Sequence, residues 1–214
     1  MKLYGYFRSS ASFRVRIALN LKNVAYDAEF IHLTRGGGEQ FASAFEAVNP
    51  QSLVPVLEDG GTLIPQSLAI LEYLEETHPI PPLLPPSAAE RARVRALAQL
   101  VACDIHPLQN LRVLKFLKED LGRGRDDRLR WCRHWIALGL AAVEKLLDGH
   151  PAAGTFCHGE SPTLADICLV PQIFNARRFD CDLSGYPAVM GVFDACMALP
   201  AFDKAQPSRQ PDAE

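Results

Sequence analysis

Residues 53–64 have the sequence LVPVLEDGGTLI, which predicts two short β-strands joined by a tight turn at Asp59-Gly60-Gly61. Directly after them, the apolar residues of 67–77 (SLAILEYLEET) recur at helical spacing. The sequence therefore predicts a β-hairpin that is followed directly by an amphipathic helix.

The residues before this hairpin predict two strand and helix pairs. Residues 2–6 alternate in polarity as a strand does, and residues 12–22 (SFRVRIALNLK) have the period of a helix. A second strand is expected near residues 25–31 and a short helix near residues 40–48, with Gly36-Gly37-Gly38 in the loop between them. We therefore expect the order β-α-β-α-β-β-α.

A proline-rich segment separates this region from a second one. Residues 79–87 (PIPPLLPPS) can neither continue a helix nor pair inside a sheet, so we expect a stiff linker. It divides a domain of residues 1–80 from a second domain of residues 88–214, whose tail from Pro207 onward is expected to fray. The pattern of the second domain predicts helices at residues 88–117, 126–147, 163–178 and 187–197. Within the first of these, Asp104-Ile105-His106-Pro107 predicts a kink.

Composition excludes several functional classes. The chain has 214 residues, 48% hydrophobic and 22% charged, which is typical of globular proteins. Its 22 basic residues are spread among 25 acidic ones for a net charge of −3, so we expect no nucleic-acid partner. No apolar run reaches the roughly 18 residues of a membrane span, and the start MKLYGYFRSS lacks a signal core. We therefore expect a cytoplasmic protein.

The six cysteines have no spacing that suits a metal ion or a redox motif. They are Cys103, Cys132, Cys157, Cys168, Cys181 and Cys196. We interpret them as reduced and mostly buried, and we expect no metal site.

Serines gather where the first strand meets the first helix. Arg8-Ser9-Ser10-Ala11-Ser12 places hydroxyl groups at a helix N-terminus. One interpretation is capping, in which a serine oxygen accepts from a backbone N–H of the first turn. The other is a site for an anion or a thiolate, which the positive end of a helix dipole favours.

Two further polar segments stand beside the hairpin. In residues 49–55 (NPQSLVP) the Val54-Pro55 step precedes a strand, either as simple punctuation or as a turn that offers the Val54 backbone to an extended peptide. Gln66-Ser67 begins the following helix, either as a cap or as the binding site of an α-carboxylate.

Together these segments carry a family resemblance. The strings S-S-x-S-x-R-V-R-I-A-L-N-L-K, N-P-x-x-x-V-P-V-L and Q-S-L-A-I-L-E-Y-L-E-E closely resemble zeta-class glutathione transferases, which include maleylacetoacetate and maleylpyruvate isomerases. The similarity continues through D-I-H-P-L-Q-N-L-R-V-L-K, T-L-A-D-I-C-L-V-P-Q and A-R-R-F to Q-P-S-R-Q-P-D, so it covers nearly the whole chain.

The resemblance implies a fold and a cofactor. The fold would be a thioredoxin-like β-α-β-α-β-β-α domain followed by an all-helical bundle, in a homodimer that binds glutathione. Ser9 and Ser10 would lie beside the glutathione sulfur, and Val54, before a cis Pro55, would pair with the cysteinyl backbone. The remaining implied glutathione contacts are Gln40, Gln66, Ser67, His106 and Asn110.

The activity that the resemblance implies is the cis-trans isomerisation of a small unsaturated dicarboxylate in aromatic catabolism. Such a dianion needs fixed positive charge, and the candidates are Arg8, Arg112 and Arg178, each of which could instead be a solvated surface residue. Arg8 is counted with Ser9 and Ser10 as catalytic. Ala11 stands where many zeta-class enzymes have cysteine, which puts in doubt any reaction that depends on that thiol.

Two alternatives remain open at this point. One is a transferase that conjugates glutathione or metabolises α-haloacids, and which consumes glutathione as product forms. The other is a binding protein without catalysis. Presence of Ser9, Ser10, Val54, Gln66 and Ser67 together argues against the second, because a scaffold has no need of a complete thiol site.

Overall fold

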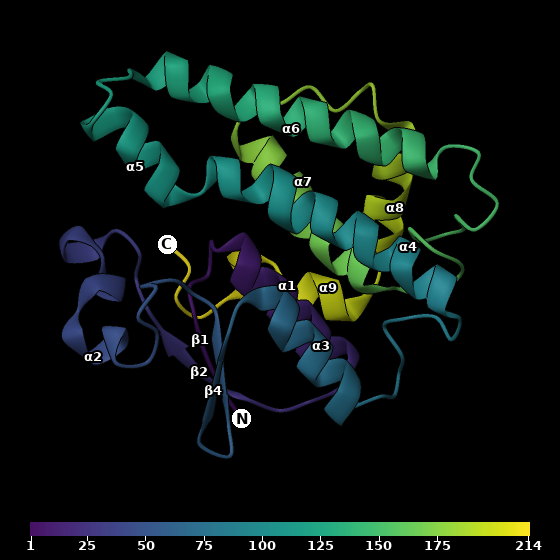
Figure 1. Cartoon of the computed structure of the whole chain (residues 1–214), viewed down its shortest axis with the longest axis horizontal. Coiled ribbons are helices and arrows are strands. Elements are labelled where there is room, and N and C mark those ends of the chain that lie inside the picture. The colour runs from purple at the N-terminus through teal and green to yellow at the C-terminus, as the bar shows by residue number, and fades with distance from the viewer. The chain divides into compact units, whose positions relative to one another are not determined.

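The computed structural model describes all residues, 1–214. The chain divides into two compact units (Figure 1). Unit 1 contains residues 1–83 together with 198–214, and unit 2 contains residues 84–197.

A mixed four-stranded sheet lies in unit 1. Its strands are β1 (Lys2–Gly5), β2 (Asp27–Phe30), β3 (Val56–Asp59) and β4 (Thr62–Pro65), in the order β2-β1-β3-β4. Strand β1 pairs parallel to β2 and antiparallel to β3, which pairs antiparallel to β4. The predicted hairpin is confirmed, and its turn residues Gly60 and Gly61 have φ of 54° and 83°, a region that glycine enters without steric cost.

Unit 1 also contains four α-helices. They are α1 (Ser10–Leu21), α2 (Ser43–Glu46), α3 (Ser67–Thr77) and α9 (Pro200–Ala205). Helix α1 packs against both α3 and α9, and its residues Phe13, Ile17 and Leu19 are buried (Figure 1). The predicted α3 is confirmed. The helix expected at 40–48 is only partly present, because a 3₁₀ turn at Glu39–Phe41 and extended backbone at Ala42 precede the single turn of α2.

A buried ion pair fixes the end of α3. Lys22 Nζ lies 2.8 Å from Glu75 Oε2 and also donates to the carbonyl groups of His78 and Pro81, at 2.7 and 3.0 Å. Glu75 also accepts from the backbone N–H of Leu83. The side chains of Lys22 and Glu75 therefore hold the start of the proline-rich segment against unit 1.

The C-terminal segment departs from two expectations. We predicted one helical domain over residues 88–214, but residues 198–214 belong to unit 1, because α9 packs on α1. Asn20 Nδ2 donates to the Ala201 carbonyl at 2.9 Å, which adds a polar tie.

The prediction that the tail frays is wrong. Asp212 accepts from the backbone N–H of Phe7 at 2.9 Å, and Gln210 donates to the Lys204 carbonyl at 2.9 Å. Side-chain hydrogen bonds therefore hold this polar segment, and an argument from composition alone misses such contacts.

Unit 2 is all-helical. It contains α4 (Ala88–Gln99), α5 (Leu111–Glu119), α6 (Arg125–Leu147), α7 (Leu164–Arg178) and α8 (Pro187–Met197). Helix α7 packs against α4 and α8, and most of its residues are buried. Four of the six cysteines are buried, as expected; Cys181 is half-buried and Cys103 is exposed. No helix of either unit has the length and apolar character that a membrane crossing needs.

The helix expected over residues 88–117 is interrupted. A π-helical segment at Leu100–Ile105 and a 3₁₀ turn at His106–Gln109 separate α4 from α5. Pro107 cannot continue an α-helix, and the Asn110 side chain caps the next one by accepting from the Arg112 N–H at 3.2 Å. The predicted kink is confirmed, and it extends to a complete break.

Candidate active site

The strand register brings three predicted site segments to the same end of the unit 1 sheet. Tyr4, near the end of β1, pairs with Val56, the first residue of β3, and Val56 pairs with Pro65, the last residue of β4. The serines follow β1, Val54-Pro55 precedes β3, and Gln66-Ser67 follows β4. Antiparallel pairing therefore gathers segments that lie far apart in the sequence.

At the N-terminus of α1, Ser9 is the capping residue. Its Oγ accepts from the Ser12 N–H at 3.2 Å, and its own N–H donates to the Tyr6 carbonyl at 3.0 Å. The capping interpretation is thus confirmed for Ser9. Ser10 is the first helical residue and is half-buried, and its hydroxyl is not used as a cap. The helix start therefore holds two more hydroxyls, those of Ser10 and Ser12, than capping requires.

Arg8 is exposed beside these serines. Its guanidinium lies over the rings of Tyr6 and Phe7, 5.7 and 5.6 Å from their centroids. Those two rings belong to a buried cluster with Val54 and Val56. Stacking on fixed rings limits the freedom of the guanidinium while its charge stays available to an anion.

The Val54-Pro55 peptide bond is cis. Neither the N–H nor the C=O of Val54 takes part in a backbone hydrogen bond within the chain. The preceding loop is held by Asn49, whose Nδ2 donates to the Leu53 carbonyl at 2.8 Å. A well-ordered backbone edge with unused donor and acceptor is what strand-like pairing with a peptide ligand requires.

Gln66 occupies the capping position of α3 with φ of 71°, a left-handed conformation unusual for a residue other than glycine. Its Nε2 donates to Gln51 Oε1 at 2.8 Å. Ser67 does not cap this helix. It is buried, and its Oγ accepts from Arg14 Nη1 at 3.2 Å. The capping interpretation of Ser67 is therefore wrong.

Gln40, the other candidate of unit 1, is buried and not exposed at the surface. Its side chain is buried, its Nε2 donates to the Leu33 carbonyl at 3.3 Å, and its amide lies directly against Gly38. Its Oε1 is buried and has no hydrogen-bond partner in the chain.

The remaining candidates belong to unit 2. His106 is half-buried at the start of a 3₁₀ turn, and Asn110 caps α5. Arg112 is exposed in the first turn of α5. Arg178 is exposed at the end of α7, where its guanidinium lies 5.0 Å from the Phe179 ring centroid.

The sequence analysis missed three charged residues beside the Ser9-Ser10 segment. Arg14 and Arg16 are buried in α1, and Asp212 lies in the tail. Burial lowers the pKa of Arg16 to about 10, and the nearby Tyr26 and Asp212 oppose this shift. The sequence R-V-R inside an otherwise apolar helix could have indicated Arg14 and Arg16, because buried guanidinium groups need hydrogen-bond partners.

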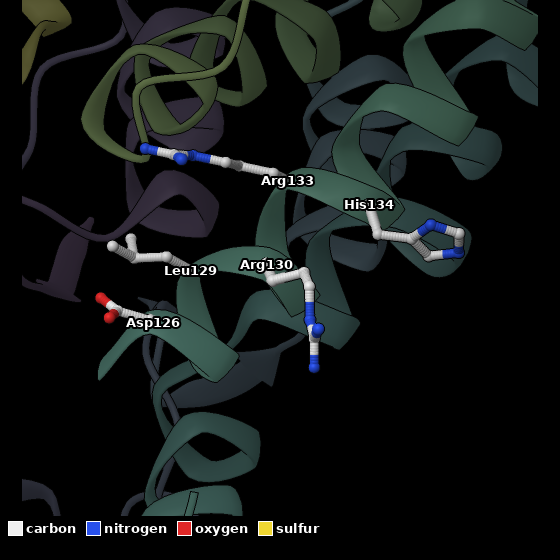
Figure 2. A pocket seen from close by; sticks show the side chains of 5 residues that line it. All are labelled: Asp126, Leu129, Arg130, Arg133 and His134. Atoms are coloured by element: carbon white, nitrogen blue, oxygen red, sulfur yellow. The ribbon is translucent and has the colours of Figure 1, made fainter. Parts of the chain in front are cut away.

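A pocket in unit 2 does not contain any predicted site residue. Its lining residues are Asp126, Leu129, Arg130, Arg133 and His134, all from α6 (Figure 2). Figure 2 shows the two arginine side chains extending in different directions. Arg130 pairs with Asp127, and Arg133 donates to the Phe179 carbonyl. We therefore assign no function to this helix surface.

Comparison with known families defines the class of protein. Residues 3–85 match the family described as glutathione S-transferase, N-terminal domain, and residues 136–195 match glutathione S-transferase, C-terminal domain. The fold and the site thus belong to a glutathione S-transferase.

Close relatives narrow the class further. A probable maleylacetoacetate isomerase of Vibrio cholerae is 50% identical over 99% of this chain and 97% of the relative. A holo structure of a zeta-class bacterial maleylpyruvate isomerase is 48% identical, with a TM-score of 0.97 and full coverage of both chains. The maleylacetoacetate isomerase of Methylobacterium extorquens AM1, solved with malonate and glutathione bound, is 45% identical with a TM-score of 0.96 and full coverage of both chains. The chain belongs to the zeta-class family of maleylacetoacetate and maleylpyruvate isomerases.

Proposed function

We propose that this protein is a glutathione-dependent cis-trans isomerase that converts maleylacetoacetate or maleylpyruvate to the fumaryl isomer. The observation that carries the proposal is the meeting of the α1 N-terminus, the Val54 backbone and Gln66-Ser67 at one end of a sheet. Full-length identity to isomerases of this name supports the same reaction.

The residues present fit glutathione chemically. The unused N–H and C=O of Val54 suit the backbone of its cysteinyl residue. The N-terminus of α3, with Gln66 and Ser67, suits the α-carboxylate of its γ-glutamyl end. By family resemblance, Gln40, His106 and Asn110 would lie near the rest of the tripeptide.

Bound glutathione supplies a thiolate that adds to the cis double bond and leaves again after rotation about the resulting single bond, so that it is regenerated. The α1 N-terminus and a serine hydroxyl, from Ser9 or Ser10, lower the pKa of this thiol by favouring its anion. Three arginines, Arg8, Arg112 and Arg178, bind the two carboxylates of the substrate and orient its double bond.

Ala11 bears on the choice between isomerase and conjugating transferase. It removes a cysteine common at this position in the family, but isomerisation needs only the sulfur of glutathione. A transferase that conjugates glutathione or metabolises α-haloacids remains the second candidate, because the same thiolate can attack other electrophiles.

An assay that counts thiols separates the two. Loss of each cis substrate is followed by absorbance, with and without glutathione, while free thiol is measured in parallel. We expect turnover only with glutathione and no net loss of thiol. Thiol loss in proportion to product would establish the transferase instead, and equal rates without glutathione would overturn both.

Three broader features complete the proposal. A cytoplasmic location would supply reduced glutathione continuously, since that compartment keeps the glutathione pool reduced. The family resemblance supports a homodimer, which size-exclusion chromatography with light scattering tests directly. The same resemblance places the reaction in the catabolism of aromatic compounds.

A further inference from the structure

The backbone N–H and C=O of Phe7 are hydrogen-bonded to side chains of opposite charge. Its N–H donates to Asp212 Oδ2 at 2.9 Å, and its C=O accepts from Arg16 Nη2 at 2.9 Å. Phe7 immediately precedes Arg8 and stands two residues before Ser9. A carboxylate on the N–H and a guanidinium on the C=O make both of these backbone hydrogen bonds charge-assisted.

Arg16 ties the remainder of this turn as well. Its Nη1 donates to the Tyr6 carbonyl at 3.3 Å, the same oxygen that accepts from the Ser9 N–H at 3.0 Å. Its Nε donates to the carbonyl of Ala205 at 2.9 Å, at the end of α9. One buried guanidinium thus connects the turn before the serines to the segment that leads to Asp212.

The tail follows a defined path to this contact. Gln210 Nε2 donates to the carbonyls of Lys204 and Gln206, at 2.9 and 3.0 Å. Asp212 then lies beside a small cavity shared with Arg16 and Tyr26, and its Oδ1 is buried without a hydrogen-bond partner. The carboxylate is therefore fixed on Phe7 by the tail on one side and by the charge of Arg16 on the other.

We propose that Asp212, acting with Arg16 on the backbone of Tyr6 and Phe7, is a positioning residue that sets the place of Arg8 and Ser9 relative to the glutathione sulfur. Without Asp212 the turn keeps its covalent path but loses one of its two charged supports. A displacement of even about 1 Å at a thiol-binding hydroxyl is enough to slow chemistry strongly. The inference rests on the proposed function of this site.

The test compares three substitutions at one position in the full-length protein. Asp212→Ala removes the acceptor, Asp212→Asn keeps an oxygen that can accept from Phe7, and Asp212→Glu keeps the charge but moves it by one methylene. Asp203→Ala is the matched control, because that carboxylate contacts only its neighbours Gln206 and Arg209 in the same C-terminal segment.

Three measurements are made on each variant: amide hydrogen exchange of Phe7 and Ser9 without ligand, the pKa of the bound glutathione thiol from thiolate absorbance, and kcat with KM. For Asp212→Ala we expect faster exchange at both amides, a raised thiol pKa and a roughly ten-fold lower kcat with little change in KM. Asp212→Asn should stay within about three-fold of wild-type kcat, because only the charge assistance is lost. The Asp203→Ala control should match wild type.

Wild-type exchange, thiol pKa and kcat in Asp212→Ala would overturn the inference. If that variant does not fold, wild-type values of all three in folded Asp212→Glu would do the same. A wild-type protein that binds no glutathione would instead overturn the proposed function, whereas the exchange of the Phe7 amide would still report whether Asp212 holds the turn.

Discussion

At the scale of single residues, Ser9 makes a capping contact that Ser10 lacks, and this contact bears on which hydroxyl would serve the thiolate. A lone pair of Ser9 Oγ is already engaged by the Ser12 N–H. Its O–H is therefore left to donate outward from a fixed position, which is the arrangement that favours a developing or resident anion. Ser10, inside the first turn, has no such anchoring contact.

This difference leads to separable effects of Ser9→Ala and Ser10→Ala. Ser9→Ala should lower the free energy of unfolding by about 1 kcal/mol through loss of the cap, and Ser10→Ala should not. Turnover should fall by roughly one to three orders of magnitude for the serine that donates, which we expect to be Ser9. Urea unfolding and steady-state kinetics measure the two effects. Unchanged turnover in both variants would show that neither hydroxyl serves the thiolate.

At the scale of elements, the buried ion pair between Lys22, which follows α1, and Glu75 of α3 should contribute strongly to the free energy of unfolding. The side chain of Lys22 is 0% exposed and that of Glu75 is 9% exposed. Lys22→Met should leave a buried carboxylate without its cation and lower the free energy of unfolding by about 3–5 kcal/mol. Urea titration measures this loss.

The control for that experiment is a surface pair of the same type. Lys2 lies 4.0 Å from Glu58, with side chains 41% and 34% exposed. Lys2→Met should therefore cost less than about 1 kcal/mol. Equal losses for the two variants would mean that burial does not govern the strength of these pairs.

The end of the tail has a predicted pH dependence. Hydrogen bonds from Arg35 and then His32 lower the pKa of Glu214 below its usual 4.5. A lowered pKa means that this contact stabilises the tail at pH above the unfolded value and is lost as the pH falls through the folded value. The carboxyl and Arg35 resonances, followed by NMR from pH 6 downward, should therefore change together at a pH below the usual pKa of a glutamate carboxyl. In Glu214→Gln, Arg35 should lose this transition and respond only to its longer pair with Glu39, at 3.9 Å.

Elements with strong local signals were predictable, and those that depend on distant partners were not. The Gly60-Gly61 hairpin and α3 follow directly from turn chemistry and helical period. The tail could not be predicted, because Asp212 gains its role only from Phe7, which lies 205 residues away. The candidate glutathione residues came mainly from family resemblance. The sequence pattern alone could not decide whether Ser9 and Ser67 cap helices or bind a ligand. The structure shows that Ser9 is a cap and that Ser67 is not.

At the scale of the whole molecule, glutathione should stabilise the folded protein by mass action. At a concentration of about 100 times its Kd, a ligand that binds only the folded state adds roughly 2.7 kcal/mol to the free energy of unfolding. We therefore expect Tm to rise by several degrees, measured by calorimetry. S-methylglutathione is the matched ligand, since it keeps the peptide contacts and lacks the thiol. A Tm that responds to neither compound would speak against a tripeptide site in unit 1.

The return of the last helix to unit 1 has a consequence for synthesis. Helix α9 packs on α1, and Asp212 reaches Phe7. The unit that begins at the N-terminus therefore cannot reach its final form while the chain is still being translated, because its closing residues leave the ribosome last. Unit 2, continuous in sequence from 84 to 197, can complete its packing first. Synthesis of the glutathione-binding unit thus begins before that of unit 2, but its folding can be completed only after unit 2 has been synthesised.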